Sequence, residues 1–340
     1  MPHPSPRDVA LNPEWLPHAF DAGGQQLTSV FVPRSAREEL LFLADAHFAN
    51  RFDKVTLPAP VAAAAAAEAE QAPLHFIFHT SFCCSTLLAR ALEVPGAASS
   101  LREPNVLVNL AERLIQGSPQ QVRPSLDLAA RLLARPFASG EAVVVKPSNF
   151  ANALIEPLLT IRPTSRAVLL YSDTATFLRS LLKRGLLARI NARKLYLNLS
   201  SWSAVRFGFS EAESFEQTDL QVAALAWLMH IAQFQQVAGR FGADRVMILD
   251  AADLLADPAR ALGRVQSFFG LGLDQDRVSA ITTGPVFSRH SKSSDMDYDS
   301  DARRRDHDAL MEVHGAELNM VLQWLNAVAG QTGVPLRPRV

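Results

Sequence analysis

From Leu74 onward, short apolar runs alternate with longer stretches in which apolar residues recur at helical spacing. The runs predict buried strands at 74–79, 98–102, 142–146, 166–171 and 245–249. The intervening stretches predict helices at 86–93, 106–116, 125–135, 150–160, 174–184 and 219–240. Short buried strands separated by helices are typical of a parallel sheet covered on both faces. The pattern therefore predicts an α/β fold with a central parallel sheet of about five strands flanked by helices.

The first 73 residues do not show this alternation. Residues 1–34 are rich in proline and indicate no particular element, whereas Ser35-Ala36-Arg37-Glu38 is typical of a capping box that opens a helix over 36–48. The alanine-rich stretch 59–73 fits either a coil or a frayed helix. We therefore expect residues 1–73 to be an N-terminal extension and connector, followed by an α/β domain over 74–340 with a helical insertion near 186–218.

Composition, net charge and cysteine content limit the partners and the compartment to be expected for this protein. The 340 residues are 48% hydrophobic, and the formal net charge of −1 gives no overall field to attract nucleic acid or an anionic membrane. No run of about 18 apolar residues indicates a membrane span, and the N-terminus lacks the pattern of a signal peptide. The two cysteines, Cys83 and Cys84, are adjacent, which argues against a disulfide framework and favours a reducing compartment. We expect a cytoplasmic protein with no nucleic-acid partner.

Candidate binding residues follow the first predicted strand. In parallel sheets, ligands bind beyond the carboxyl ends of the strands. The turn Thr80-Ser81-Phe82-Cys83-Cys84-Ser85-Thr86 leads into a helix, whose free amides and dipole favour an anion near Ser85 and Thr86. The turn lacks the glycines and the lysine of the usual phosphate loop. An ordinary helix cap beside two buried cysteines explains the same residues equally well.

Three charged residues follow other strands. Glu103 could act as a general base, although Glu-Pro before a helix is also common turn chemistry. Lys146 ends a run of three valines, so its charge must reach either solvent or an anion. Asp250 after "VMIL" could hold Mg²⁺ beside a phosphate loop, or simply end a buried strand.

The motifs between residues 74 and 292, taken in their order along the chain, resemble those of the P-loop sulfotransferases. These enzymes use 3′-phosphoadenosine 5′-phosphosulfate (PAPS). "FHTSFCCSTLLARAL" resembles their 5′-phosphosulfate loop, "LREP" the motif with the catalytic base, and "VVKPSN" their Lys-(Ser/Thr)-Pro strand end. "LLYSDTATFLRSLL" is similar to the 3′-phosphate motif, and "FSRHSKSS" to a late basic segment that closes over the donor. The chain departs from the family at Phe82, Cys84, Ser172 and Thr174, where the family has Lys or Arg, Gly, Arg and Pro.

The resemblance implies a P-loop-type three-layer fold and transfer of a sulfuryl group from PAPS to a hydroxyl or amine. The acceptor, a small molecule or a glycan, is not indicated, and no metal is expected. Glu103 would be the catalytic base, and Lys146 would stabilise the leaving oxygen. The residues implied to bind the donor are Thr80, Ser81, Cys83, Cys84, Ser85, Thr86, Ser180, Lys183, Arg289 and Lys292.

Two other functions stay open on the residues alone. Asp250 and Thr86 fit an enzyme that transfers a phosphoryl group from Mg²⁺-ATP, and a degenerate loop fits a non-catalytic member that binds a nucleotide or a partner protein. The alternating Asp295, Asp297, Asp299 and Asp301 look like the start of a calcium loop, but Ser300 and Asp306 replace its glycine and glutamate. We interpret this run as a solvated loop.

Overall fold

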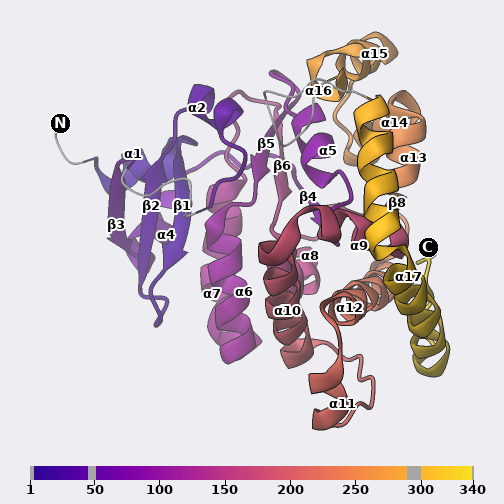
Figure 1. Cartoon of the computed structure of the whole chain (residues 1–340). Coiled ribbons are helices and arrows are strands. Elements are labelled where there is room, and N and C mark those ends of the chain that lie inside the picture. The colour runs from indigo at the N-terminus through magenta and orange to yellow at the C-terminus, as the bar shows by residue number, and fades with distance from the viewer. Residues whose placement is uncertain (1–3, 45–50, 289–299, 339–340) are drawn as a thin grey trace. The chain divides into compact units, whose positions relative to one another are not determined.

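The structure is a computed structural model of the chain and describes residues 4–44, 51–288 and 300–338 (Figure 1). The chain divides into two compact units, each described by itself below. The first comprises Met1–Phe78, Ser85–Val168 and Pro258–Phe287, and the second comprises His79–Cys84, Leu169–Asp257 and Ser288–Val340. No helix in the described part of the chain has both the length and the apolarity needed to cross a bilayer.

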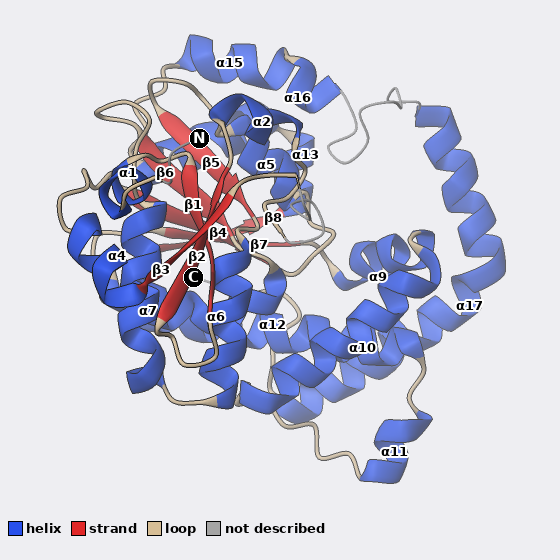
Figure 2. Ribbon diagram, turned by 90° about the vertical axis from the view of Figure 1, so that its left-hand side faces the viewer, coloured by secondary structure: helices blue, strands red, loops and turns tan. Residues whose placement is uncertain are grey.

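The five strands predicted from the sequence form one sheet in the order β5-β6-β4-β7-β8, drawn in red in Figure 2. Their bounds are β4 (Leu74–His79), β5 (Ala98–Arg102), β6 (Ala142–Lys146), β7 (Ala167–Tyr171) and β8 (Val246–Asp250). Both β4 and β5 pair with β6 in parallel. Every residue of β4, β5, β6 and β7 is buried, as expected for a sheet covered on both faces. The predicted α/β fold class is confirmed.

Most helices of the first unit follow these strands. They are α5 (Ser85–Ala91), α6 (Asn105–Gln116), α7 (Pro119–Leu133), η1 (Asn149–Leu154), α8 (Ile155–Ile161), α14 (Pro258–Phe269), α15 (Gln275–Thr283) and α16 (Pro285–Ser288). Helix α7 begins earlier than predicted because Ser118 and Gln121 form a capping box ahead of it. The helix predicted at 150–160 is a 3₁₀ turn, η1, that continues into α8.

The first unit also contains an antiparallel sheet that the sequence pattern did not predict. Its strands are β1 (Trp15–Phe20), β2 (Gln26–Phe31) and β3 (Lys54–Pro58), and it is accompanied by α1 (Pro6–Leu11) and α4 (Ala59–Ala66). Strand β1 packs against α6 and α7, beside which the sheet lies in Figure 1. In the alanine-rich stretch 59–73, residues 59–66 form helix α4 and residues 67–73 are turn and coil.

The helix predicted over 36–48 is wrong in both start and length. Helix α2 spans only Arg34–Glu39, and Pro33 precedes it without any side-chain cap, so the predicted capping box at Ser35 does not form. Leu40 is already extended, with φ −75° and ψ 125°. The described residues 41–44 are irregular.

The second unit is mainly helical. Its helices are α9 (Thr174–Lys183), α10 (Gly185–Trp202), α11 (Glu211–Glu216), α12 (Asp219–Phe241), α13 (Ala251–Ala256) and α17 (Ser300–Thr332). Helix α12 is the centre of this unit, because it packs against α9, α10, α17 and β8. The fully buried Trp227 of α12 donates its indole N–H to the carbonyl of Ser172 at 2.9 Å, which ties α12 to the end of β7.

Candidate functional site

The loop after β4 has an unusual backbone. Ser81, Phe82 and Cys84 all have positive φ, at 77°, 51° and 60°. For residues other than glycine, this left-handed conformation costs about 1 kcal/mol each. Loops that bind phosphate commonly use such positions to direct backbone N–H groups at the anion, and they usually place glycine there. The loop therefore keeps a left-handed backbone although its sequence contains no glycine.

Hydrogen bonds within the second unit hold this loop. The backbone N–H of Ser81 donates to Nδ1 of His79 at 3.0 Å, and the N–H of Thr80 donates to the carbonyl of Leu170 at 3.2 Å. The Cys83 thiol donates to the same carbonyl at 3.4 Å. His79 was not among the predicted site residues. The signal for it was its position as the last residue of a buried strand.

Phe82 occupies the position where the resembling family has a cation. Its ring lies 5.7 Å from the ring of Phe177 on α9, at an interplanar angle of 54°. Tilted aromatic pairs at such distances are favourable. Phe82 thus packs on α9, and any anion held by the loop would depend on other groups for its contacts.

Glu103 and Lys146 are brought together at the ends of β5 and β6. Arg102 lies opposite Lys146 in the parallel register, and the N–H of Glu103 donates to the Lys146 carbonyl at 2.6 Å. The Lys146 ammonium forms an ion pair with Oε1 of Glu103, and the two side chains are 1% and 19% exposed. Glu103 also has a positive φ, 55°. The charge of Lys146, expected to reach solvent or an anion, is paired with Glu103.

The sequence reasoning also missed the segment that covers this pair. The Phe42 ring centroid lies 5.3 Å from Nζ of Lys146. Leu43 donates its backbone N–H to the carbonyl of Arg102 at 2.7 Å. The only signal in the sequence is the apolar "LLFL" at 40–43, which lies within the helix predicted over 36–48.

The other predicted site residues are dispersed. Ser85 and Thr86 begin α5 and are buried. On α9, Ser180 is half-buried and Lys183 is exposed at the end of the helix. Arg289 and Lys292 lie outside the described residues. The first unit thus contains Ser85, Thr86, Glu103 and Lys146, and the second contains residues 80–84, Ser180 and Lys183.

Ser172 and Thr174 replace an arginine and a proline of the resembling 3′-phosphate motif. Ser172 is 2% exposed, and its hydroxyl oxygen has no hydrogen-bond partner. Thr174 begins α9, which is capped by Asp173 through an N–H from Thr176 to Oδ1 at 2.9 Å. The helix start is therefore satisfied by this chain's own carboxylate.

Asp250, the candidate magnesium ligand, already has two partners. Its Oδ1 accepts the N–H of Ala252 at 2.9 Å and so caps α13. The second partner is the Tyr171 hydroxyl, which is hydrogen-bonded to the Asp250 side chain. Burial, the charge of the Asp250 carboxylate and this hydrogen bond together raise the pKa of Tyr171 to about 12. Within the described ranges, no three His, Cys, Asp or Glu residues are grouped so that they could hold a metal ion.

Part of the calcium-like run is helical. Asp295, Asp297 and Asp299 lie outside the described residues. The chain enters α17 at Ser300, so Asp301 and Asp306 are in a helix. The predicted solvated loop therefore does not extend beyond Ser300.

Comparisons with known proteins give structural matches only. No protein-family model matches the sequence, and no curated protein does. Among solved structures, the sulfotransferase domain from the curacin biosynthetic pathway is 12% identical, with 78% of this chain and 98% of that chain covered and a TM-score of 0.42. Sulfotransferase STF1 from Mycobacterium tuberculosis is 14% identical, with 66% and 78% covered and a TM-score of 0.43. The sulfotransferase from Alicyclobacillus acidocaldarius is 15% identical, with 75% and 95% covered and a TM-score of 0.39.

The solved structures named above are thus sulfotransferases. Because these TM-scores are all below 0.5, the proposals that follow rest on the chain's own residues.

Proposed function

We propose that the chain is a sulfotransferase that moves a sulfuryl group from PAPS to a hydroxyl or amine acceptor. One observation supports this most directly. Among the described residues, the non-glycine positions with positive φ are Ser81, Phe82, Cys84 and Glu103, which all follow β4 or β5. Strained backbone of this kind clusters at functional sites, where the surrounding structure maintains it. These are the strand ends at which the sequence predicts the donor loop and the catalytic base.

In this proposal the donor's 5′-phosphate is bound by backbone amides within residues 81–86 and by the hydroxyls of Ser85 and Thr86. Since Phe82 packs on Phe177, no loop cation contributes. The 3′-phosphate is bound by Ser180 with either Lys183 or Arg289, and Arg289 and Lys292 belong to the late basic segment proposed to close over the donor.

The reaction needs one base and one cation. The acceptor oxygen attacks sulfur, the bond between sulfur and the phosphate oxygen breaks, and the acceptor proton passes to the Glu103 carboxylate. The products are a sulfate ester, or a sulfamate from an amine, and adenosine 3′,5′-bisphosphate. Lys146 neutralises the charge that develops on the leaving phosphate oxygen. Because Lys146 is paired with Glu103, its ammonium must turn toward that oxygen as the donor binds, and this frees Glu103 to take the proton.

The two alternatives predict different ligands. Transfer from Mg²⁺-ATP would use Asp250, whose carboxylate already caps α13. A non-catalytic member would bind a nucleotide without turnover, or would bind none. The cytoplasmic location expected from the adjacent cysteines Cys83 and Cys84 stays a prediction.

Calorimetry on the full chain separates these functions. We expect heat of binding with adenosine 3′,5′-bisphosphate, unchanged by EDTA, and weaker heat with Mg²⁺-ATP. Lys183→Ala should weaken the bisphosphate but not adenosine 5′-monophosphate, which lacks the 3′-phosphate. With labelled PAPS and a panel of hydroxyl and amine acceptors, Glu103→Gln should lower turnover by about 10²–10⁴ while binding persists. Binding of Mg²⁺-ATP alone, or of no nucleotide, would overturn the proposal.

A further inference from the structure

We infer that residues 37–43, called here the clamp, belong to the catalytic centre and position Glu103 and Lys146. The catalytic part of this inference rests on the proposed function, whereas the contacts of the clamp do not depend on it. The clamp comes from the N-terminal 73 residues, which the sequence pattern separated from the α/β domain. All the residues involved belong to the first unit.

Leu43 forms a backbone hydrogen bond on each side of the turn that contains Glu103. Its backbone N–H donates to the carbonyl of Arg102 at 2.7 Å, and its own carbonyl accepts the N–H of Asn105 at 3.0 Å. The two residues between these anchors are Glu103 and Pro104. Glu103 has a φ of 55°, a conformation that persists only where surrounding contacts over-determine it. The two bonds to Leu43 supply such contacts.

The Arg102 side chain fixes the beginning of the clamp. Arg102 is 5% exposed, and its Nη2 donates to the carbonyls of Arg37 and Leu40, the latter at 2.8 Å. These carbonyls lie at the carboxyl end of α2, where a helix leaves acceptors unsatisfied and a cation is favourable. The guanidinium thus ends α2 and directs the chain into the extended residues that reach Glu103.

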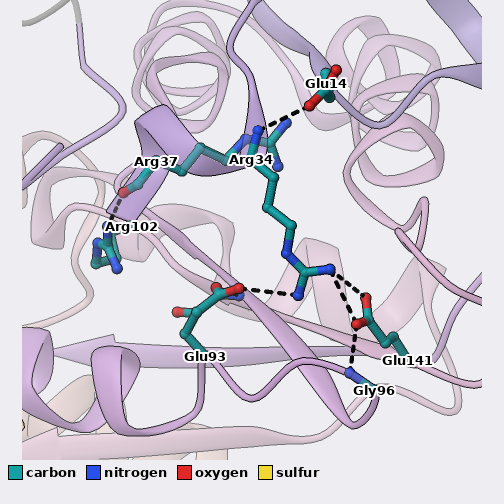
Figure 3. Close-up of polar contacts among 8 residues, drawn as sticks. Glu14, Arg34, Arg37, Glu93, Gly96, Arg102 and Glu141 are labelled. Carbon is teal, nitrogen blue, oxygen red and sulfur yellow. Dashed lines mark hydrogen bonds and ion pairs between the residues drawn. The ribbon is translucent and has the colours of Figure 1, made fainter. Parts of the chain in front are cut away.

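Arg34 fixes the beginning of α2 (Figure 3). Its Nη1 lies 3.2 Å from Oε1 of Glu141, and its Nη2 lies 3.3 Å from Oε1 of Glu93. The Glu141 side chain is 1% exposed and also accepts the N–H of Gly96 at 2.7 Å. The buried Glu141 carboxylate is thus held by both the Arg34 guanidinium and a backbone N–H. Helix α2 is therefore anchored at both ends to the segments that carry β5 and β6.

Phe42 covers the ion pair. With its ring centroid 5.3 Å from Nζ of Lys146, it lies within the range of a cation–π contact. The side chain of Lys146 is 1% exposed, with Glu103 and Phe42 beside its ammonium. Phe42 is thus a positioning residue, which keeps water from the ammonium and keeps it beside Glu103 until the donor binds.

Lysine acylation of the full chain tests the clamp without any assumption about the reaction. The chain contains only Lys54, Lys146, Lys183, Lys194 and Lys292, and the first, third and fourth of these are exposed. With an amine-reactive acetyl ester at pH 8 and peptide mass spectrometry, we expect Lys146 to react far more slowly than Lys183 and Lys194. Phe42→Ala should raise the Lys146 rate about 10-fold, since one cation–π contact and its cover are lost.

Two controls accompany this variant. Phe215→Ala removes a 91% exposed ring on α11 and should leave every lysine rate unchanged. In Phe42→Leu the bulk remains and only the ring is lost, so the Lys146 rate should rise less than in Phe42→Ala. If Phe42→Ala does not fold, a higher Lys146 rate in Phe42→Leu supports the clamp. An unchanged Lys146 rate in the folded variant overturns it.

A second arm addresses catalysis. Phe42→Ala should lower kcat for labelled PAPS by about 10-fold or more while the Kd for adenosine 3′,5′-bisphosphate stays unchanged, because the clamp orients the reacting groups. A merely structural role would weaken both together. Wild-type protein that binds no bisphosphate would refute the proposed function and leave the acylation result to decide on the clamp. Faster Lys146 acylation without loss of kcat would refute the catalytic part of the inference.

Discussion

Lys146 and Glu103 share one ion pair but differ sharply in exposure. The lysine side chain is 1% exposed, whereas the glutamate side chain keeps 19% of its surface in contact with solvent. Removal of either partner leaves the other charge unpaired, but only the glutamate has access to water. The two single variants should therefore differ in stability.

We expect Glu103→Gln to lower the free energy of unfolding by about 3 kcal/mol, because it leaves a buried ammonium without a counter-charge. Lys146→Met should cost less, since it leaves a carboxylate that water still reaches. The double variant should be more stable than Glu103→Gln alone. Urea denaturation of all three variants at pH 7 measures the differences. Equal losses for the two single variants would contradict this asymmetry.

The left-handed loop residues allow a stabilising substitution. Cys84 has a φ of 60°, so Cys84→Gly should raise the free energy of unfolding by about 0.5–1 kcal/mol by relieving backbone strain. Cys83→Gly is the matched control: this neighbour is 1% exposed and is not among the positive-φ residues, so the change should destabilise. Thermal unfolding compares the two. A loss of stability in Cys84→Gly as large as that in Cys83→Gly would mean that the loop is not strained.

The Arg135 guanidinium holds the N-terminal segment by hydrogen bonds to backbone carbonyls. Arg135 is 3% exposed, and its guanidinium donates to the carbonyls of Leu132, Val9, Ala10, Asn12 and Trp15. Arg135→Met should lower the free energy of unfolding by about 3 kcal/mol, because several buried carbonyls lose a charged donor. Arg123→Ala, an exposed change on α7, should stay within about 0.5 kcal/mol of wild type. Similar effects of both changes in urea denaturation would refute this role.

His75 should make stability depend on pH. Burial, followed by the nearby Arg166, lowers the pKa of His75 to about 4, and its ring stacks on Phe269 at 4.8 Å. Since an unfolded histidine titrates near about 6.5, the unfolded chain binds more protons below that pH. The stability contributed by neutral His75 is complete above about pH 6.5 and is lost as the pH falls toward 4.

His75→Asn tests this directly, because its side-chain oxygen can still accept the Arg166 N–H that Nδ1 accepts at 3.1 Å. When the pH falls from 6 to 5, wild type should lose about 1.2 kcal/mol more stability than the variant. Denaturation midpoints measured across this range give the slopes. Parallel curves for the two proteins would show that His75 is not the titrating group.

The sequence predicted the parallel strands well because burial on both faces leaves a continuous apolar run. The sequence did not predict β1, because Pro17 and His18 interrupt its apolar run. It did not predict β2 either, because buried and exposed residues do not alternate regularly along that strand. Local signals also failed at both ends of α2: the helix already begins at Arg34, ahead of the predicted cap at Ser35, and it ends at Glu39, near the carbonyls of Arg37 and Leu40 to which Arg102 donates. Tertiary hydrogen bonds decided the outcome at its carboxyl end.

At the candidate site, the sequence singled out Glu103 and Lys146 separately. Their ion pair depends on the parallel register that places Arg102 beside Lys146, which no local pattern encodes. The loop at 80–84 showed no glycine, so its left-handed backbone could not be read from composition. Phe42 and Leu43 were out of reach for a similar reason: their partners come from strands far along the chain.

The location of the clamp bears on how the protein can be shortened. A truncated chain starting at Leu74 would keep all five strands of the parallel sheet, yet it would lack Leu43 and Phe42. Such a fragment would expose the Lys146 ammonium to solvent and release the turn after β5. Under the proposed function, a chain trimmed to the recognisable α/β part would thus lack the contacts that position Glu103 and Lys146.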